Sequence, residues 1–144
     1  MAKDKSQVEI LSYGIYEKWD NKRKSLPKVQ TFTLSIPAEV DIEFGFIINI
    51  KKAKGQKIRF EIDHPGILDK KGRPLPPFEG EEYIRDNNWQ FYLGDTIWLP
   101  LDDKVGQWRM SVELAGNIIA EKCFEVYYAD EADNVAAFWK KRGF

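Results

Sequence analysis

The segment spanning residues 106–126 constrains the fold of this chain more than any other. Apolar residues recur at every second position in each half of it, and a turn at Ala115-Gly116-Asn117 separates the halves. A period of two is typical of strands with one buried face, so the segment predicts a two-stranded antiparallel hairpin. We expect it to close an all-β sandwich. Its apolar residues are Trp108, Met110, Val112 and Leu114, then Ile118, Ala120, Phe124 and Val126.

The register of this hairpin depends on the length of its loop. A two-residue loop, Gly116-Asn117, places Val112 opposite Glu121, so that an apolar face meets a charged one. A three-residue loop over 115–117 keeps apolar residues opposite one another, and we therefore expect the longer loop, with a bulge possible near Lys122. The predicted inner pairs are Leu114–Ile118, Val112–Ala120 and Trp108–Phe124, and the outer face carries a solvent-side charge ladder of Arg109, Glu121, Cys123 and Glu125.

Strand-like segments fill most of the remaining chain. They cover residues 8–16, 31–36, 42–50, 58–62 and 89–93, with a further short run at 96–101. Helices between the strands, which an α/β fold requires, are missing from the pattern. We predict one domain over residues 1–144, with an immunoglobulin-like antiparallel β-sandwich of about seven to nine strands over 8–128. The tail, 129–144, has the 3/4 spacing of a short helix at 131–141.

Composition excludes several classes of protein. The 144 residues are 43% hydrophobic, enough for an ordinary core, and 22 basic against 23 acidic residues predict no general attraction to nucleic acid or an anionic membrane. Cys123 is the single cysteine, so no internal disulfide forms. No apolar stretch approaches the ~20 residues of a membrane helix. We expect a soluble cytoplasmic protein, although a secreted protein that has lost its signal peptide would look the same.

The order of motifs resembles that of a known family. The motifs are Tyr13-Gly14-Ile15-Tyr16, Phe44-Gly45-Phe46, His64-Pro65, Lys71-Gly72-Arg73-Pro74, and Gly106-x-Trp108 with Ile119-Ala120-Glu121-x-x-Phe124-x-Val126. In these residues the chain, from about Val8 to Val126, is similar to a bacterial family of single-domain, immunoglobulin-like β-sandwich proteins catalogued as a domain of unknown function. The resemblance implies the sandwich fold and supplies no catalytic residues.

Candidate catalytic and metal-binding residues are few. His64, the only histidine, precedes a proline at a strand end, which is typical of a turn residue. The segment 64–88 reads as a long loop that ends in acidic residues, and these have neither the spacing of the known calcium loop nor a fixed separation for glycoside hydrolysis. We expect no catalytic residue, no cofactor and no metal. The acidic residues are Glu79, Glu81, Glu82 and Asp86.

Aromatic residues outside the strand pattern are the remaining candidates for binding. Trp89 and Trp108 lie on apolar strand faces and predict core positions, whereas Trp98, beside a proline, fits either a buried or an exposed position. Trp19 lies in a basic loop, and the tail can pack on its own sandwich, on a second copy or on another protein. The candidate contact residues are Trp19, Trp98, Phe138 and Trp139.

Three functions fit these observations to different degrees. The strong sandwich pattern without a catalytic set favours a non-enzymatic binding or protein-interaction module that works through its long loops or an open sheet edge. Its partner is an unidentified protein or a second copy of the chain. The alternative is a carbohydrate-binding module that stacks sugars on Trp19, Trp98 or Trp139. A hydrolase or calcium-dependent enzyme centred on His64 and the acidic loop is the third.

Overall fold

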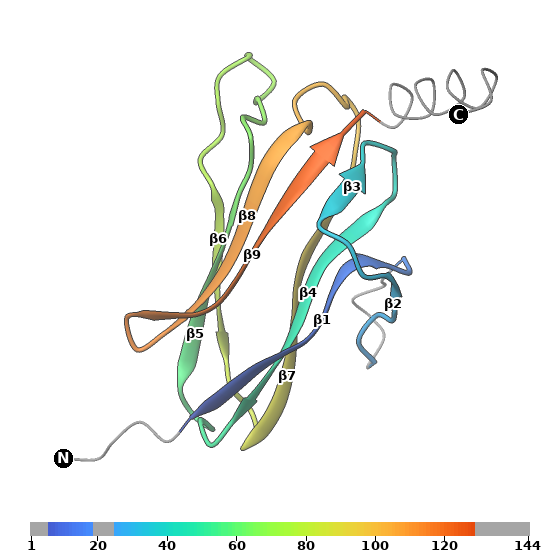
Figure 1. The fold of residues 1–144 in the computed structure, drawn as a ribbon. Helices are drawn as coiled ribbons and strands as arrows, with labels where there is room; N and C mark the ends of the chain where they lie inside the picture. The colour runs from blue at the N-terminus through green and yellow to red at the C-terminus, as the bar shows by residue number, and fades with distance from the viewer. Residues whose placement is uncertain (1–5, 19–24, 129–144) are drawn as a thin grey trace.

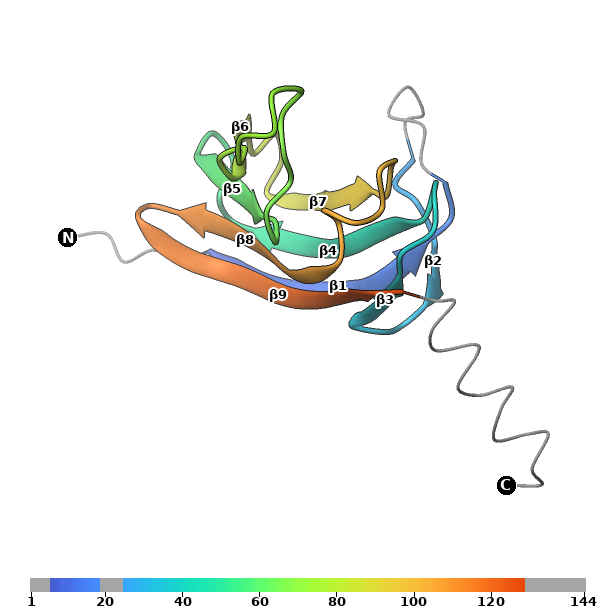
Figure 2. The same ribbon diagram turned by 90° about the horizontal axis from the view of Figure 1, so that it is seen from above.

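Two β-sheets face one another in this fold (Figures 1 and 2). The computed structural model describes residues 6–18 and 25–128, and within them the regular elements are nine strands. The first sheet has the order β2-β1-β4-β7 and the second β3-β9-β8-β5-β6. This confirms the predicted all-β sandwich. The strands are β1 (Gln7–Tyr16), β2 (Val29–Thr31), β3 (Ser35–Pro37), β4 (Glu43–Lys51), β5 (Lys57–Asp63), β6 (Phe78–Tyr83), β7 (Asn88–Thr96), β8 (Gly106–Leu114) and β9 (Asn117–Tyr127).

The core lies between β4 of the first sheet and the β8–β9 hairpin of the second. The ring of Phe44 meets those of Trp108 and Phe124 edge-on, at centroid distances of 5.2 and 5.5 Å. Each such side chain contributes about 1.5–3 kcal/mol when fully buried. The predicted inner face of the hairpin is confirmed as packing. Its buried residues are Trp108, Val112, Leu114, Ala120 and Phe124, opposite Phe44, Phe46, Ile48 and Ile50 of β4.

The hairpin turn differs from the prediction. It has two residues, Ala115-Gly116, both with positive φ (52° and 81°), as a type I′ turn requires. Glu113 pairs with Ile118 and Val112 pairs with Ala120, so Ile119 is an extra residue that forms a bulge in β9. This bulge shifts the register by one residue, which is the shift that the predicted three-residue loop would provide. The register from Val112 back to Trp108 is therefore as predicted, but the loop length is wrong, and the bulge lies at Ile119 and not near Lys122. The predicted pair Leu114–Ile118 is also wrong, because Leu114 pairs with Asn117, and Ile118, opposite Glu113, is exposed.

Three other segments also correct the sequence prediction. Residues 31–36 form no continuous strand, because the chain crosses here from β2 in the first sheet to β3 in the second, leaving Phe32 60% exposed. The predicted loop 64–88 contains β6, and the run at 96–101 leaves the sheet after Thr96. The helix predicted at 131–141 falls outside the described residues. The described part holds no helix of the length and apolarity needed to cross a membrane.

Three glycines bring β1, β4 and β7 close together in the first sheet. Gly14 pairs with Gly45, and Gly45 pairs with Gly94. A Cβ atom on Gly45 would lie 2.1 Å from the carbonyl oxygen of Leu93, and one on Gly14 would lie 2.0 Å from that of Thr31. Both distances are below van der Waals contact, so no side chain fits at either position. This close approach holds β7 against β4 at one end of the sheet.

Candidate functional site

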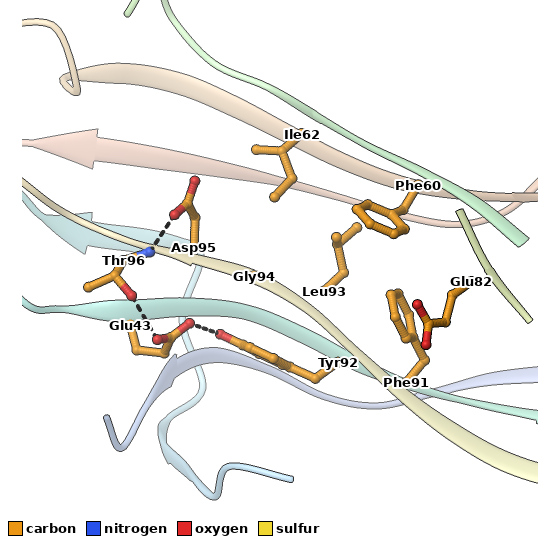
Figure 3. Close-up of a pocket in the computed structure, with 10 residues that line it drawn as sticks. All are labelled: Glu43, Phe60, Ile62, Glu82, Phe91, Tyr92, Leu93, Gly94, Asp95 and Thr96. Carbon is orange, nitrogen blue, oxygen red and sulfur yellow. Dashed lines mark hydrogen bonds between the residues drawn. The ribbon is translucent and has the colours of Figure 1, made fainter. Parts of the chain in front are cut away.

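Strand β7 is the outermost strand of the first sheet and forms one wall of a cleft. All nine of its residues pair with β4 on one side, and no other described strand pairs with it. Across from it lie β5 and β6, at one edge of the second sheet. The cleft between them has a volume of about 530 Å³ (Figure 3). It is lined by Glu43, Phe60, Ile62, Glu82, Phe91, Tyr92, Leu93, Gly94, Asp95 and Thr96.

Strand alternation places an apolar surface in this cleft. Phe91 and Leu93 lie on the inner face of β7 and belong to the main core, whereas Tyr92, on the outer face, belongs to a separate small cluster. The Phe60 ring lies 5.6 Å from that of Phe91. It has room because residue 80 of β6 is glycine, where a Cβ atom would come within 2.3 Å of the ring.

Three carboxyl groups line the same cleft, and among the residues that the structure describes no lysine, arginine or histidine lines it. Asp95 points toward the Ile62 side of β7, and Glu82 lies beside Phe91 (Figure 3). Glu43 lies on the other side of the strand, where it accepts hydrogen bonds from the Tyr92 hydroxyl and from Thr96 Oγ1 at 2.8 Å. The cleft therefore combines an apolar centre with negative charge.

Burial changes the acidity of two of these groups. It raises the pKa of Asp95 to about 6, and the negative charge of Glu43 adds to the rise. The Thr96 N–H, which donates to Asp95 Oδ1 at 2.8 Å, and the positive charge of Lys104 act in the opposite direction. Burial also raises the pKa of Glu43, against its two hydrogen bonds. A carboxylate that is poorly solvated in this way gains from an approaching cation.

Asp95→Asn should stabilise the protein at pH 7.5 by about 1–2 kcal/mol. The pKa of Asp95 is about 6 in the folded protein and 3.8 in the unfolded chain. Its contribution to the free energy of unfolding is therefore fully present below pH 3.8 and is lost as the pH rises through 6. The difference corresponds to about 3 kcal/mol, which partial contact with water reduces. Urea unfolding at pH 4 and 7.5 measures it, with the exposed Asp63→Asn as the control. A variant less stable than the parent at pH 7.5 would contradict the argument.

Trp98, the candidate contact residue that falls within the described part of the chain, does not line the cleft. Trp98 is 37% exposed, and its ring lies 4.3 Å from the Lys104 ammonium and 6.4 Å from the Phe78 ring. Trp19, Phe138 and Trp139 fall outside the described residues. Trp89, predicted as core, is only partly buried and stacks on Phe91 at 5.4 Å, beside the cleft. The carbohydrate alternative stays a prediction.

His64 acts as the turn residue that the sequence predicts. Its ring is buried, Nδ1 accepts the Ile67 N–H at 2.9 Å, and Nε2 lies 3.1 Å from the Pro76 carbonyl oxygen, to which it donates. Both ring nitrogens therefore bind the backbone of the loop between β5 and β6. With both positions used in this way, the ring is not oriented toward a nucleophile.

The acidic residues of 79–82 lie on a strand and not in a loop. Glu79 binds Arg59 at 2.9 Å and Glu81 binds Lys57 at 2.7 Å, so β6 and β5 are joined by a ladder of exposed ion pairs. Glu82, on the alternate face, lies 3.4 Å from the exposed Arg85. In the described residues no three histidine, cysteine or acidic side chains are grouped as metal ligands.

Lys104, in the loop after β7, is fully buried, and no sequence pattern points to it. Its Nζ donates to the Pro100 carbonyl oxygen at 2.9 Å and to Asp103 Oδ1, and its own carbonyl oxygen accepts the Trp108 Nε1–H at 2.8 Å. Asp103 in turn accepts the Leu68 N–H at 3.2 Å. Lys104 therefore ties two loops at the end of the sandwich nearest Asp95.

Comparison with known proteins supports the fold. Residues 4–126 match the pattern of a family described as Domain of unknown function (DUF3859). A crystal structure of an immunoglobulin-like protein from Pseudomonas aeruginosa is similar, with a TM-score of 0.67 and 20% sequence identity, over 87% of this chain and 100% of that one. At this identity the likeness establishes the fold alone. No curated protein matches the chain significantly.

Proposed function

The chain belongs to the DUF3859 family of domains of unknown function, and from the geometry of its cleft we propose that it is a non-enzymatic binding module. In this proposal the outer edge of β7 takes up an extended peptide as an additional strand. The observation that carries the proposal is that β7 is a long and regular edge strand. All nine of its residues pair with β4, and Asp95 is its one charged side chain.

Other edges of the two sheets are protected in ways that β7 is not. Proteins normally shield edge strands with charge, shortness or bulges, since an exposed regular edge pairs with other chains. β6 carries three glutamates, and β2 and β3 have three residues each. β1 is interrupted by a bulge between Ile10 and Ser12. In the described part of the chain, β7 is the long, regular and nearly uncharged edge.

The hydrogen-bonding groups of β7 alternate between β4 and the free edge. The Ile97 N–H binds the Ile42 carbonyl oxygen, so odd-numbered residues of the strand face β4. Even-numbered residues, Gln90 and Gly94 among them, then direct their N–H and C=O groups outward. A peptide on this edge gains main-chain hydrogen bonds from β7, and every second side chain lies over the cleft, where selectivity arises.

Hydrogen exchange of a peptide-bound sample should locate the binding edge. The probes are three soluble peptides of alternating threonine, Thr-X-Thr-Val-Thr-X-Thr, with X as lysine, glutamine or glutamate. With at least one of them at saturation, NMR should show exchange of the Gln90 and Gly94 amides slowed about tenfold or more, because these amides become hydrogen-bonded. Protection that appears only on other strands, or none with any of the three, would refute strand addition.

A matched pair of variants tests the same edge. Gln90→Pro removes an outward N–H and should keep the pairing with β4, because that N–H does not face β4. We expect it to weaken peptide binding at least about tenfold, whereas Gln90→Thr, which keeps the N–H, should bind like the parent. Circular dichroism and urea unfolding establish that both variants fold. Equal peptide affinity of the two variants would contradict the proposal.

A further inference from the structure

The charges of the cleft are spaced along β7 in a way that specifies a peptide sequence. Asp95 lies at one end of the inner face, and Glu82 lies beside Phe91 toward the other end, with Leu93 between (Figure 3). Phe91 and Asp95 are four residues apart, which is about 13 Å along a strand. A paired strand has the same rise, so its residues facing Phe91 and Asp95 are also four apart, and the residue midway faces Leu93.

We propose that the peptide bound on β7 has the pattern basic-x-apolar-x-basic, with lysine or arginine at both basic positions. This inference rests on the proposed function and names its ligand class. One basic side chain lies against Glu82, the other against Asp95, and the apolar side chain between them covers Leu93 and the neighbouring aromatic rings. The pattern reads the same in both directions, so it holds for either orientation of the bound strand.

The groups around the two carboxylates leave room for such cations. Asp95 lies on the other side of β7 from Glu43 of β4, whose negative charge raises its pKa, and the more distant Lys104, in the loop after β7, acts in the opposite direction. The Lys104 ammonium is already bound to Asp103 and the Pro100 carbonyl oxygen. Glu82 has the exposed Arg85 at 3.4 Å. An exposed pair of this kind contributes little, and a new cation can replace it.

A second copy of the chain fits the cleft less well than a basic peptide. The inner-facing residues that β7 offers to a partner strand are Trp89, Phe91, Leu93 and Asp95, none of them basic. Pairing of β7 with β7 therefore brings further carboxylates to an acidic cleft without a cation. Charge complementarity favours a partner of different sequence.

Affinities of the three peptides test the inference directly. Each cross-strand charge pair contributes about 0.2–1 kcal/mol, so two pairs should make the lysine peptide bind about tenfold more tightly than the glutamine peptide in calorimetry at pH 7.5. The glutamate peptide should bind more weakly still. A lysine peptide of equal composition, Thr-Lys-Thr-Lys-Thr-Val-Thr, should lose part of the gain, because its cations are two residues apart.

Variants of the protein assign the cations to their carboxylates. Asp95→Asn and Glu82→Gln should each weaken the lysine peptide about threefold and leave the glutamine peptide unchanged. Glu79→Gln, on the outward face of β6, is the matched control and should not change either affinity. Lowering the pH from 7.5 to 5 protonates Asp95 and should weaken the lysine peptide about threefold in the parent, but not in Asp95→Asn.

The outcomes separate this inference from the proposed function. If the glutamine or glutamate peptide binds as tightly as the lysine peptide and still protects Gln90 and Gly94, the charge pattern is wrong and strand addition stands. If none of the peptides protects those amides, both fail. Dimerisation of the free protein through β7, seen by light scattering together with the same amide protection, would overturn the assignment of a basic peptide as the occupant.

Discussion

Gly45→Ala should destabilise the domain by at least about 3 kcal/mol. The added Cβ would lie 2.1 Å from the Leu93 carbonyl oxygen and 2.5 Å from the Gly94 Cα, and both are backbone atoms that cannot rotate away. Relief requires β4 and β7 to separate at this end of the first sheet, which breaks their pairing there. Overpacking of ordinary core positions costs about 1–3 kcal/mol, and a backbone neighbour relaxes less than a side chain. The midpoint of urea unfolding measures the effect.

A second glycine gives the control for this prediction. Gly116 lies in the β8–β9 turn with φ of +81°, and a Cβ atom added to it would have no neighbour within 4 Å. Asparagine tolerates this conformation, so Gly116→Asn should change the free energy of unfolding by less than about 1 kcal/mol. A Gly45→Ala variant as stable as Gly116→Asn would mean that the strands part without cost, and the account of this sheet would be wrong.

Lys104→Met should cost about 3–4 kcal/mol of stability. Methionine fills most of the space, but the Asp103 carboxylate, only 12% exposed, loses its cation and the Pro100 carbonyl oxygen loses its donor. Breaking one side of a buried ion pair is strongly destabilising for this reason. In the parent, burial of Asp103 is outweighed by the hydrogen bonds from Lys104 and the Leu68 N–H, which hold its pKa below the usual value. Calorimetric and urea unfolding measure the loss.

A double variant separates charge from packing in this cluster. Lys104→Met combined with Asp103→Asn removes the isolated charge and should recover about half of the loss, because the amide still accepts the Leu68 N–H. Lys70→Met, at a lysine on the surface loop between β5 and β6, is the matched control and should remain within about 0.5 kcal/mol of the parent. If Lys104→Met behaves like Lys70→Met, the buried ammonium makes no net contribution.

Much of the sandwich can be predicted from alternation alone. Trp108 to Leu114 alternate strictly, and from Phe44 to Ile50 large apolar residues recur at every second position, with Ile47 as an additional one; both segments are strands with that face buried. Alternation does not predict β6, because its inner-facing residues, Phe78, Gly80 and Glu82, are not all apolar. Glycine is needed at position 80 because the Phe60 ring lies there, and Phe60 belongs to another strand. A local pattern does not contain that contact.

The cleft was not predictable for a related reason. Whether β7 is central or outermost depends on which strands pair, and residues 88–96 read like any half-buried strand. Asp95 looks like the end of that strand, and its pKa is raised chiefly by burial between the two sheets, with a smaller contribution from Glu43, about fifty positions earlier in the chain. Lys104 likewise reads as a loop lysine in water, although its burial depends on Pro100, Asp103 and the Trp98 ring. Sequence reasoning places the site at exposed tryptophans because aromatic residues carry a local signal.

The unlike ends of the first sheet limit how far any assembly of this chain can grow. A filament made by edge-to-edge stacking requires each copy to offer a donor edge at one end of its sheet and a matching acceptor at the other. Here β7 is regular over nine residues, whereas the far end offers the three-residue β2 and the bulged β1. Within the described residues, the first sheet therefore offers β7 no matching edge on a second copy for repeated head-to-tail stacking. In the proposed strand addition each chain therefore offers one such edge to a peptide, and the mismatch between the two ends of the sheet works against fibre formation.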